Sequence, residues 1–231
     1  MNNRFIVIAI LVAASSCRPA YVPIRENVPL LAEKYDASGA ASFSDVLNLQ
    51  FAFSPTNHIG VLFNGSRANR FSTTLEGGLG LYHKINESNV IEAYAGFGKG
   101  KLRITEPNEN SVQIRVAGWN RHYFFQVNDG GKVGKRLEGI LSGRLTLVDM
   151  YKYEKSEKGE DDDQFNLVDS GKRKLTYYFE PAVTSKLTIT KNVKLALQLG
   201  ASLPLKNHKG YSNEKIFGSI GIELCRSGLS K

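Results

Sequence analysis

The sequence predicts an all-β protein, an antiparallel up-and-down transmembrane β-barrel of about ten strands, with eight as the alternative count. Three observations lead to this fold class. Apolar residues recur at every second position from about Lys34 onward, as in strands with one apolar and one polar face. No segment shows a comparable helical period. Short turns also alternate with longer loops along the chain.

Composition excludes several other classes. The 231 residues carry a net charge of +8 and are 42% apolar, which excludes wholesale disorder. Two cysteines are too few for a disulfide scaffold. Beyond its very start the chain has no apolar run of about 18 residues, so a helical multispan membrane protein is excluded. The positive charge does not indicate nucleic acid, because no recognition module is present.

Residues 1–16 have the pattern of a secretory signal peptide. Arg4 supplies the positive charge, Phe5–Ala14 is an apolar run, and the small residues Ala13–Ser16 precede Cys17. An ordinary signal peptide followed by an incidental cysteine is the alternative. We expect Cys17 to be the first residue of the mature chain.

The small residues that end at Cys17 resemble a bacterial lipobox of the loosened kind found in Bacteroidota-type lipoproteins, with Ala14 in place of the usual leucine. The resemblance implies cleavage before Cys17, diacylation of its sulfur, for example with palmitate, and acylation of its new amine. Two or three acyl chains give a stable membrane anchor. Three prolines keep residues 17–33 extended, so we interpret them as a tether. Within it, the apolar patch Val28–Leu31 is a candidate to dock on the mouth of the domain.

The barrel is expected over residues 34–226, followed by a tail at 227–231. One strand breaks phase, since Val112, Ile114 and Val116 share a face whereas Tyr123 and Phe125 have the opposite parity. A bulge near Gly118–Asn120 would absorb the extra residue, and two shorter strands are the alternative. The other alternating segments are Leu47–Phe53, Ile59–Phe63, Leu75–Leu81, Ile91–Phe97, Leu137–Leu147, Val193–Leu203 and Ile216–Leu224, and the strand-like residues Lys34–Ala41 would complete an even number of strands.

The connections fall into two sets, as in outer-membrane barrels with short periplasmic turns and long external loops. With an even number of strands, both ends of the domain lie on the short-turn side. A lipid on Cys17 in the inner leaflet would be on that side too. The short set is Pro55–His58, Ile85–Ser88, Asn128–Gly134 and Thr190–Asn192, and the long set is Arg67–Ser72, Arg103–Asn110, Tyr151–Lys174 and Leu205–Glu214.

Three features together resemble small, uncharacterised outer-membrane β-barrel lipoproteins of Bacteroidota. They are the lipobox, the Tyr21-x-Pro23…Pro29-Leu30-Leu31-x-Glu33-Lys34 stretch, and Phe51-x-Phe53…His58-Ile59-Gly60-Val61 around the first short turn. The resemblance implies an integral, lipid-anchored protein of the bacterial outer membrane. One departure is the carboxyl end, where Arg226 and a Ser-Gly-Leu-Ser-Lys tail replace the terminal aromatic residue of many barrels.

The polar parity of the strands is expected to face a narrow lumen. Charges there must be paired, because an isolated buried ion is very costly. A structural network is one interpretation and a gated ion or proton path is the other. A lipid-tethered, soluble lipocalin-like barrel would instead turn this parity outward. The charged positions are Glu76, Glu92, Arg115, Glu138, Arg144, Glu180, Lys194 and Glu223.

The sequence shows no catalytic, cofactor or metal pattern. Only His208 lies in a long loop, its neighbours are cationic, and no carboxylate is close in sequence. Zinc-type spacings are absent, and the acidic stretch Glu157–Asp163 is expected to be a solvated loop. We expect Cys225 to be a free thiol, and we expect Trp119, Tyr123, Tyr151, Tyr153, Tyr177 and Tyr178 to form interface girdles.

The sequence therefore favours a non-catalytic outer-membrane barrel lipoprotein that is structural or binds a protein or small ligand through its external loops. An outer-membrane enzyme or a narrow pore is the alternative. Outer-membrane lipids, including lipopolysaccharide, are expected partners. Basic residues at the strand tops would meet the lipid phosphates, and these are Arg67, Arg70, Lys99, Lys101 and Arg103.

Overall fold

The computed structural model describes residues 24–44, 46–68, 72–107, 113–158, 164–171, 173–205 and 215–226. In these residues all the regular structure is strand, and no helix is long and apolar enough to cross a membrane. The strands are β1 Ala37–Phe43, β2 Leu47–Phe53, β3 Ile59–Arg67, β4 Thr73–Lys84, β5 Asn89–Pro107, β6 Gln113–Lys132, β7 Leu137–Lys158, β8 Asn166–Ser170, β9 Lys174–Thr190, β10 Val193–Pro204 and β11 Lys215–Arg226.

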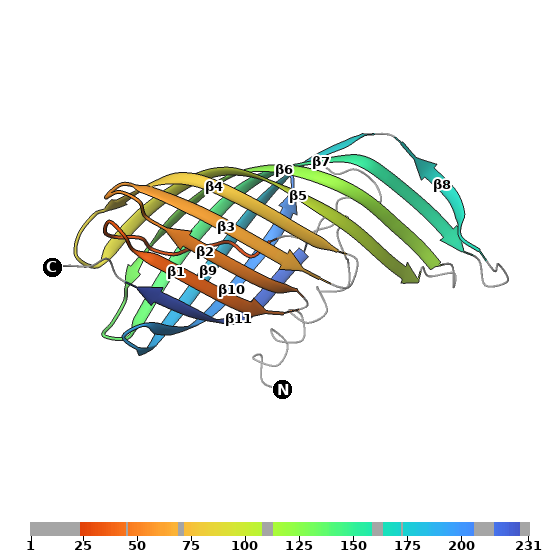
Figure 1. Cartoon of the computed structure of the whole chain (residues 1–231). Helices are drawn as coiled ribbons and strands as arrows, with labels where there is room; N and C mark the ends of the chain where they lie inside the picture. The colour runs from red at the N-terminus through yellow and green to blue at the C-terminus, as the bar shows by residue number, and fades with distance from the viewer. Residues whose placement is uncertain are drawn as a thin grey trace, which may run out of the picture.

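Ten of these strands form a closed antiparallel barrel (Figure 1). Neighbours in the sheet follow chain order except that β7 pairs with β9, and the pairing of β1 with β11 closes the barrel. The strand β8 lies outside this ring, because it pairs only with the last part of β7. The predicted fold class and the count of ten are confirmed.

The apolar parity of the wall faces outward and the polar parity faces inward. On β4, Leu75 is 70% exposed whereas its neighbour Glu76 is 5% exposed. Leu79 and Leu81 are exposed on the same face as Leu75. A soluble barrel has the reverse arrangement, with its apolar face inside, so the lipocalin-like alternative is wrong. The wall has the inside-out pattern of a membrane barrel.

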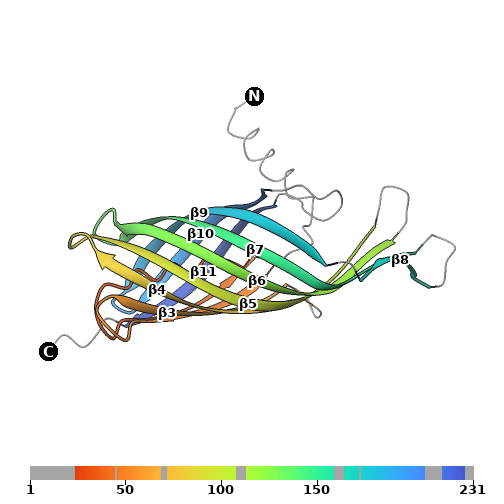
Figure 2. The same cartoon turned by 90° about the horizontal axis from the view of Figure 1, so that it is seen from above.

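The two ends of the barrel differ. The short-turn end holds the connections at 54–58, 85–88, 133–136 and 191–192, and the long-loop end is opposite. The rim of the long-loop end is uneven, because β1 and β2 have 7 residues each while β7 has 22. The outer parts of β5, β6 and β7, with β8, project beyond the rest as a curved sheet (Figures 1 and 2). Part of Tyr151–Lys174, expected to be a loop, is therefore strand.

An irregularity in the register lies at the expected level, between Trp119 and Asn120, but its extra residue is Tyr151 on β7. β6 itself pairs with β5 without interruption, so its change of pattern has another origin. From this level toward the long-loop end, the inward side chains are apolar and form a buried cluster at that end of the lumen. It contains Leu102, Val148, Met150, Tyr153 and Tyr178, with Val116 packed against it.

Three expectations are corrected because the inward face is apolar at this level. Arg115 has the parity of the exposed Trp119, and its guanidinium lies 3.7 Å from the centre of the Phe165 ring on the projecting sheet, so it does not belong to the lumen. Tyr153 and Tyr178 are buried in the apolar cap and are not girdle residues. Trp119, Tyr123 and Tyr177 do face outward.

Candidate functional site in the barrel lumen

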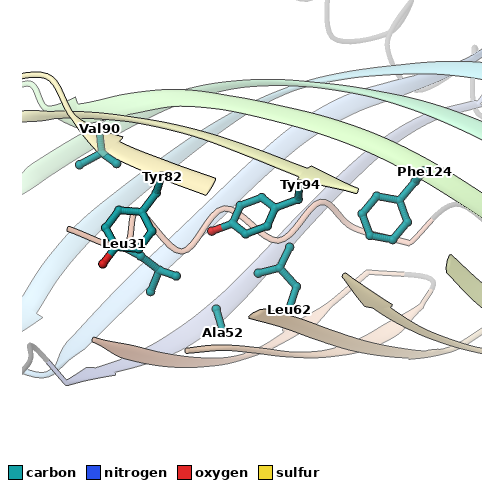
Figure 3. Packing of buried hydrophobic residues seen from close by; sticks show 7 residues of the cluster. All are labelled: Leu31, Ala52, Leu62, Tyr82, Val90, Tyr94 and Phe124. Atoms are coloured by element: carbon teal, nitrogen blue, oxygen red, sulfur yellow. The ribbon is translucent and has the colours of Figure 1, made fainter. Parts of the chain in front are cut away.

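The lumen is occupied by the segment that precedes β1. This plug segment, residues 24–33, passes between the walls, and Ile24, Glu26 and Leu31 are each at most 2% exposed. Leu31 joins a buried cluster with side chains of β2–β6 (Figure 3). The cluster consists of Leu31, Ala52, Leu62, Tyr82, Val90, Tyr94 and Phe124. The docking expected for Val28–Leu31 therefore takes place inside the barrel and not at its mouth.

The plug segment runs from the long-loop end to the short-turn end. The N–H of Arg25 donates to Asn48 Oδ1 at 3.4 Å, near the hairpin that joins β1 and β2. Six residues later, the N–H of Leu31 donates to Glu92 Oε1 at 2.7 Å, near the start of β5 at the short-turn end. Both ends of the barrel, Ala37 of β1 and Arg226 of β11, lie at the short-turn end as expected, whereas the start of the plug lies at the long-loop end. The interpretation of residues 17–33 as an external tether is wrong for 24–33, and Cys17 lies outside the described residues.

Side chains of the wall satisfy the carbonyl groups of the plug. Gln50 Nε2 donates to the Arg25 carbonyl at 2.7 Å, and Gln126 Nε2 donates to the Asn27 carbonyl at 2.7 Å. Lys186 Nζ donates to the Val28 carbonyl at 2.6 Å. A buried carbonyl without a partner would be costly. The wall is therefore built to hold an extended peptide.

A charge cluster lies beside the plug at the middle of the lumen. Arg144 makes a bidentate contact with Glu76 at 2.9 and 2.6 Å, and its Nε lies 3.5 Å from Glu180. Thr146 donates to Glu180. Glu76 also contacts His122 Nε2 at 3.1 Å and accepts a hydrogen bond from Asn64 at 2.6 Å. Three of the predicted lumen charges are therefore brought into one network.

The remaining predicted charges take other partners. Lys194 contacts both oxygens of Glu138 at 2.7 and 2.8 Å. Glu223 pairs with Lys186 at 2.6 Å. Glu92 receives the Leu31 N–H and, at 2.9 Å, the amide of Asn128. These contacts connect the charges of the wall to the plug at several levels.

Sequence reasoning missed several residues of this site. His122, Lys186 and the amides Gln50, Gln126 and Gln198 all lie on inward parity, which was the signal available for them. The plug gave no such signal, because a proline-containing segment without alternation resembles a linker. Glu26 has no predicted role, and neither of its carboxylate oxygens has a hydrogen-bond partner among the described atoms.

Glycines make room for the ring side chains of the lumen. A Cβ on Gly98 would lie 2.2 Å from His122 Nε2, and a Cβ on Gly60 would lie 2.9 Å from both Leu31 Cδ1 and the Tyr94 hydroxyl. Only glycine permits such a close approach. The glycines on the polar parity therefore position the imidazole and the end of the plug.

The polar side chains of the lumen contact the plug and one another. His122 is fully buried, its partners are Glu76 and Asn120, and Glu76 is already engaged by Arg144. The described residues contain no group of three or more side chains able to hold a metal ion. Cys225 is the free cysteine of the described chain and is partly buried. His208 and residues 159–163 of the acidic stretch lie outside the described residues.

Outside the barrel, an ion pair holds the base of the projecting sheet. Arg173 Nε and Nη2 each contact the buried carboxylate of Asp149 at 2.6 Å. These hydrogen bonds raise the pKa of the Arg173 guanidinium above its ordinary value. The pair joins the start of β9 to β7.

Comparisons with known proteins assign no family to the chain. No protein-family model matches the chain, and no curated protein matches it. Among solved structures, a KdgM porin in complex with disordered oligogalacturonate is similar at a TM-score of 0.40 and 13% identity, over 82% of this chain and 98% of that one. The translocator domain of the autotransporter NalP from Neisseria meningitidis is similar at a TM-score of 0.42 and 9% identity, over 82% and 86% of the chains.

Proposed function

We propose that the chain is a non-catalytic outer-membrane barrel that is closed by its own amino-terminal segment and acts through the surface beyond its long-loop end. The apolar outer wall supports insertion in a membrane, where lipid covers it. The plug carries the rest of the proposal. A lumen filled by the protein's own backbone leaves little space for a permeating solute.

The contacts of the plug favour permanent closure. Wall side chains from β2, β5, β6, β9 and β10 bind its backbone. Removing the plug would leave the amides and Lys186 without these acceptors and would expose the apolar cluster around Leu31. The charge network therefore serves as a structural lining, in preference to the alternative of an ion path.

Conductance in a planar bilayer tests this closure. The native barrel is expected to give no steady current. A variant with residues 24–32 replaced by a Gly-Ser segment of equal length is expected to open ion-conducting steps. A Gly-Ser replacement of residues 133–136, a turn at the other end, is the matched control and is expected to stay closed. Equal steady conductance of the native protein and the plug variant would contradict the proposal.

The projecting sheet is the proposed partner-binding surface. Its outer strand β8 pairs with β7 on one side, and Leu167 and Val168 are exposed on it. An unpaired strand edge can accept another strand by backbone hydrogen bonding. A photo-crosslinking residue at Val168 is expected to capture a specific partner in cells, whereas one at Val133, exposed at the short-turn end, is not. Equal capture at both positions would argue against this surface.

A non-catalytic role predicts that deletion of the gene leaves lipid A and surface peptides chemically unchanged. The burial of His122 supports this expectation. A change in either profile that depends on His122 or His208 would overturn it in favour of an outer-membrane enzyme.

The direction of the plug also bears on the lipid anchor. We propose that Cys17 is lipidated and that its lipid lies in the outer leaflet, because Arg25 lies at the long-loop end. Ile24 follows Cys17 by seven positions, which span at most about 25 Å. Because β1 and β2 are short, the wall is lowest at these strands, and the chain can pass over it there to reach the lipid. An epitope inserted after Ala20 is expected to bind antibody on intact cells. Binding only after permeabilisation would contradict this orientation.

A further inference from the structure

The outer wall has an apolar groove across β2–β6. Its volume is about 1140 Å³. Small residues, Gly65, Gly77 and Ala95, lie along its floor, and larger apolar side chains stand around them. The outward residues that line this wall groove include Phe63, Gly77, Phe97, Lys99, Lys101 and Trp119.

The strand register explains the deepest part of the groove. Phe63 pairs with Gly77, which pairs with Phe97, so two aromatic rings flank a position without a side chain. Phe63 is 58% exposed and Phe97 is 62% exposed. A Cβ on Gly77 would meet its nearest atoms at 3.7 Å, an ordinary contact. This position over Gly77, called the notch below, is therefore open space, and the packing of the wall does not require it to be empty.

Basic residues border the groove on the side of the long-loop end. Lys99 pairs with Leu75 and Arg121, and Lys101 pairs with Thr73 and Trp119. Lys101 Nζ lies 5.5 Å from the centre of the Trp119 ring, and Arg121 lies 4.7 Å from that of Tyr151. Asp149, which lies opposite Arg121 in the strand register, forms an ion pair with Arg173. These basic residues thus place positive charge at the level where the apolar outer surface of the wall ends.

We propose that the wall groove is a binding site for a phosphorylated lipid with several acyl chains, of the lipid A type, in the outer leaflet. One acyl chain lies in the notch over Gly77 between the two phenylalanine rings. A phosphate lies against Lys99 and Lys101, because ammonium groups at a membrane interface attract anionic headgroups. The site depends on the barrel being in a membrane, but it involves neither the plug nor the β8 edge.

Native mass spectrometry of the full-length barrel, released from detergent, tests this site. The probes are bisphosphorylated lipid A, its phosphate-free form, and phosphatidylethanolamine. The wild-type protein is expected to retain one lipid A. The double variant K99Q/K101Q is expected to bind it on the order of tenfold or more weakly, because each lysine contributes about one order of magnitude or somewhat less. The variant G77L, which fills the notch, is expected to lose the retained lipid.

Matched controls separate this site from general lipid binding. K135Q/K191Q removes two exposed lysines at the short-turn end. G143L adds a side chain at an outward glycine of β7, where a Cβ would lie 3.6 Å from the Phe179 ring. Both controls are expected to bind lipid A as the wild type does, and heat-modifiable migration in gels verifies that each variant is folded. Equal binding by wild type and K99Q/K101Q, or by lipid A and its phosphate-free form, would overturn the proposal, and so would equal losses in the controls.

Discussion

Replacing Arg144 is expected to destabilise the barrel, and replacing Glu76 in addition is expected to restore part of the loss. Arg144 is fully buried between two carboxylates, with Nη2 2.6 Å from Glu76 and Nε 3.5 Å from Glu180. The variant R144M leaves both without their main cation. Breaking a buried ion pair in this way costs about 3–5 kcal/mol.

The two other variants rank below R144M. In E76Q the arginine keeps Glu180, and an amide can still bond with Asn64 and His122, so we expect a loss of about 1–3 kcal/mol. In R144M/E76Q only Glu180 lacks a counterion, so the loss is smaller than in R144M by about 1–2 kcal/mol. The expected order of destabilisation is R144M, then the double variant, then E76Q.

Urea unfolding from lipid vesicles measures these differences. The chain has one tryptophan, Trp119, which is outward-facing and reports insertion by fluorescence. R121M removes an exposed cation and is the control, with an expected change of at most about 0.5 kcal/mol. Losses in R144M/E76Q that equal the sum of the two single losses would refute the coupling and, with it, the network as a structural lining.

Two further predictions concern the lumen. G98A is expected to lower the unfolding free energy by at least about 2 kcal/mol, since its Cβ would lie 2.2 Å from His122 Nε2. G77A is expected to be tolerated, because the nearest atoms to its Cβ would be 3.7 Å away. Equal stability of the two variants in urea titrations would contradict the assignment of Gly98 to the lumen and of Gly77 to the outer face. K186M removes the hydrogen bond to the Val28 carbonyl and the ion-pair partner of Glu223, and is expected to produce intermittent conductance. K191M, at an exposed turn, is the control and is expected to give none. Absence of conductance in K186M would show that this lysine is dispensable for holding the plug.

The barrel was predictable because its signal is local. Alternation on β4, with Leu75, Leu79 and Leu81 on one face and Glu76 on the other, reports the direction of each side chain wherever the wall separates lipid from a polar lumen. The same rule failed on β6 above Trp119, because there the inward face packs an apolar cap. Parity was read as if the environment were constant along the strand, and Arg115 was placed in the lumen for that reason.

The content of the lumen was not predictable in the same way. Glu76, Arg144 and Glu180 could be chosen as inward charges, but their grouping depends on which strands face each other across the barrel. The plug depends on hydrogen bonds from Gln126 and Lys186 over separations of 99 and 158 residues. Side-chain periodicity contains no information on such distant backbone contacts, so residues 24–33 resembled a linker.

Cross-linking residue 27 to the wall tests the location of the plug most directly. Asn27 Nδ2 lies 2.8 Å from Asn64 Oδ1 in the lumen. In a C225S background, N27C/N64C treated with a short bifunctional thiol reagent in the membrane is expected to join the tryptic peptides 26–34 and 35–67. N27C/F63C, whose second thiol faces lipid, is expected to stay unlinked. Absence of the 27–64 link, with N27C labelled by an impermeant maleimide as fast as an exposed thiol, would contradict the plugged barrel.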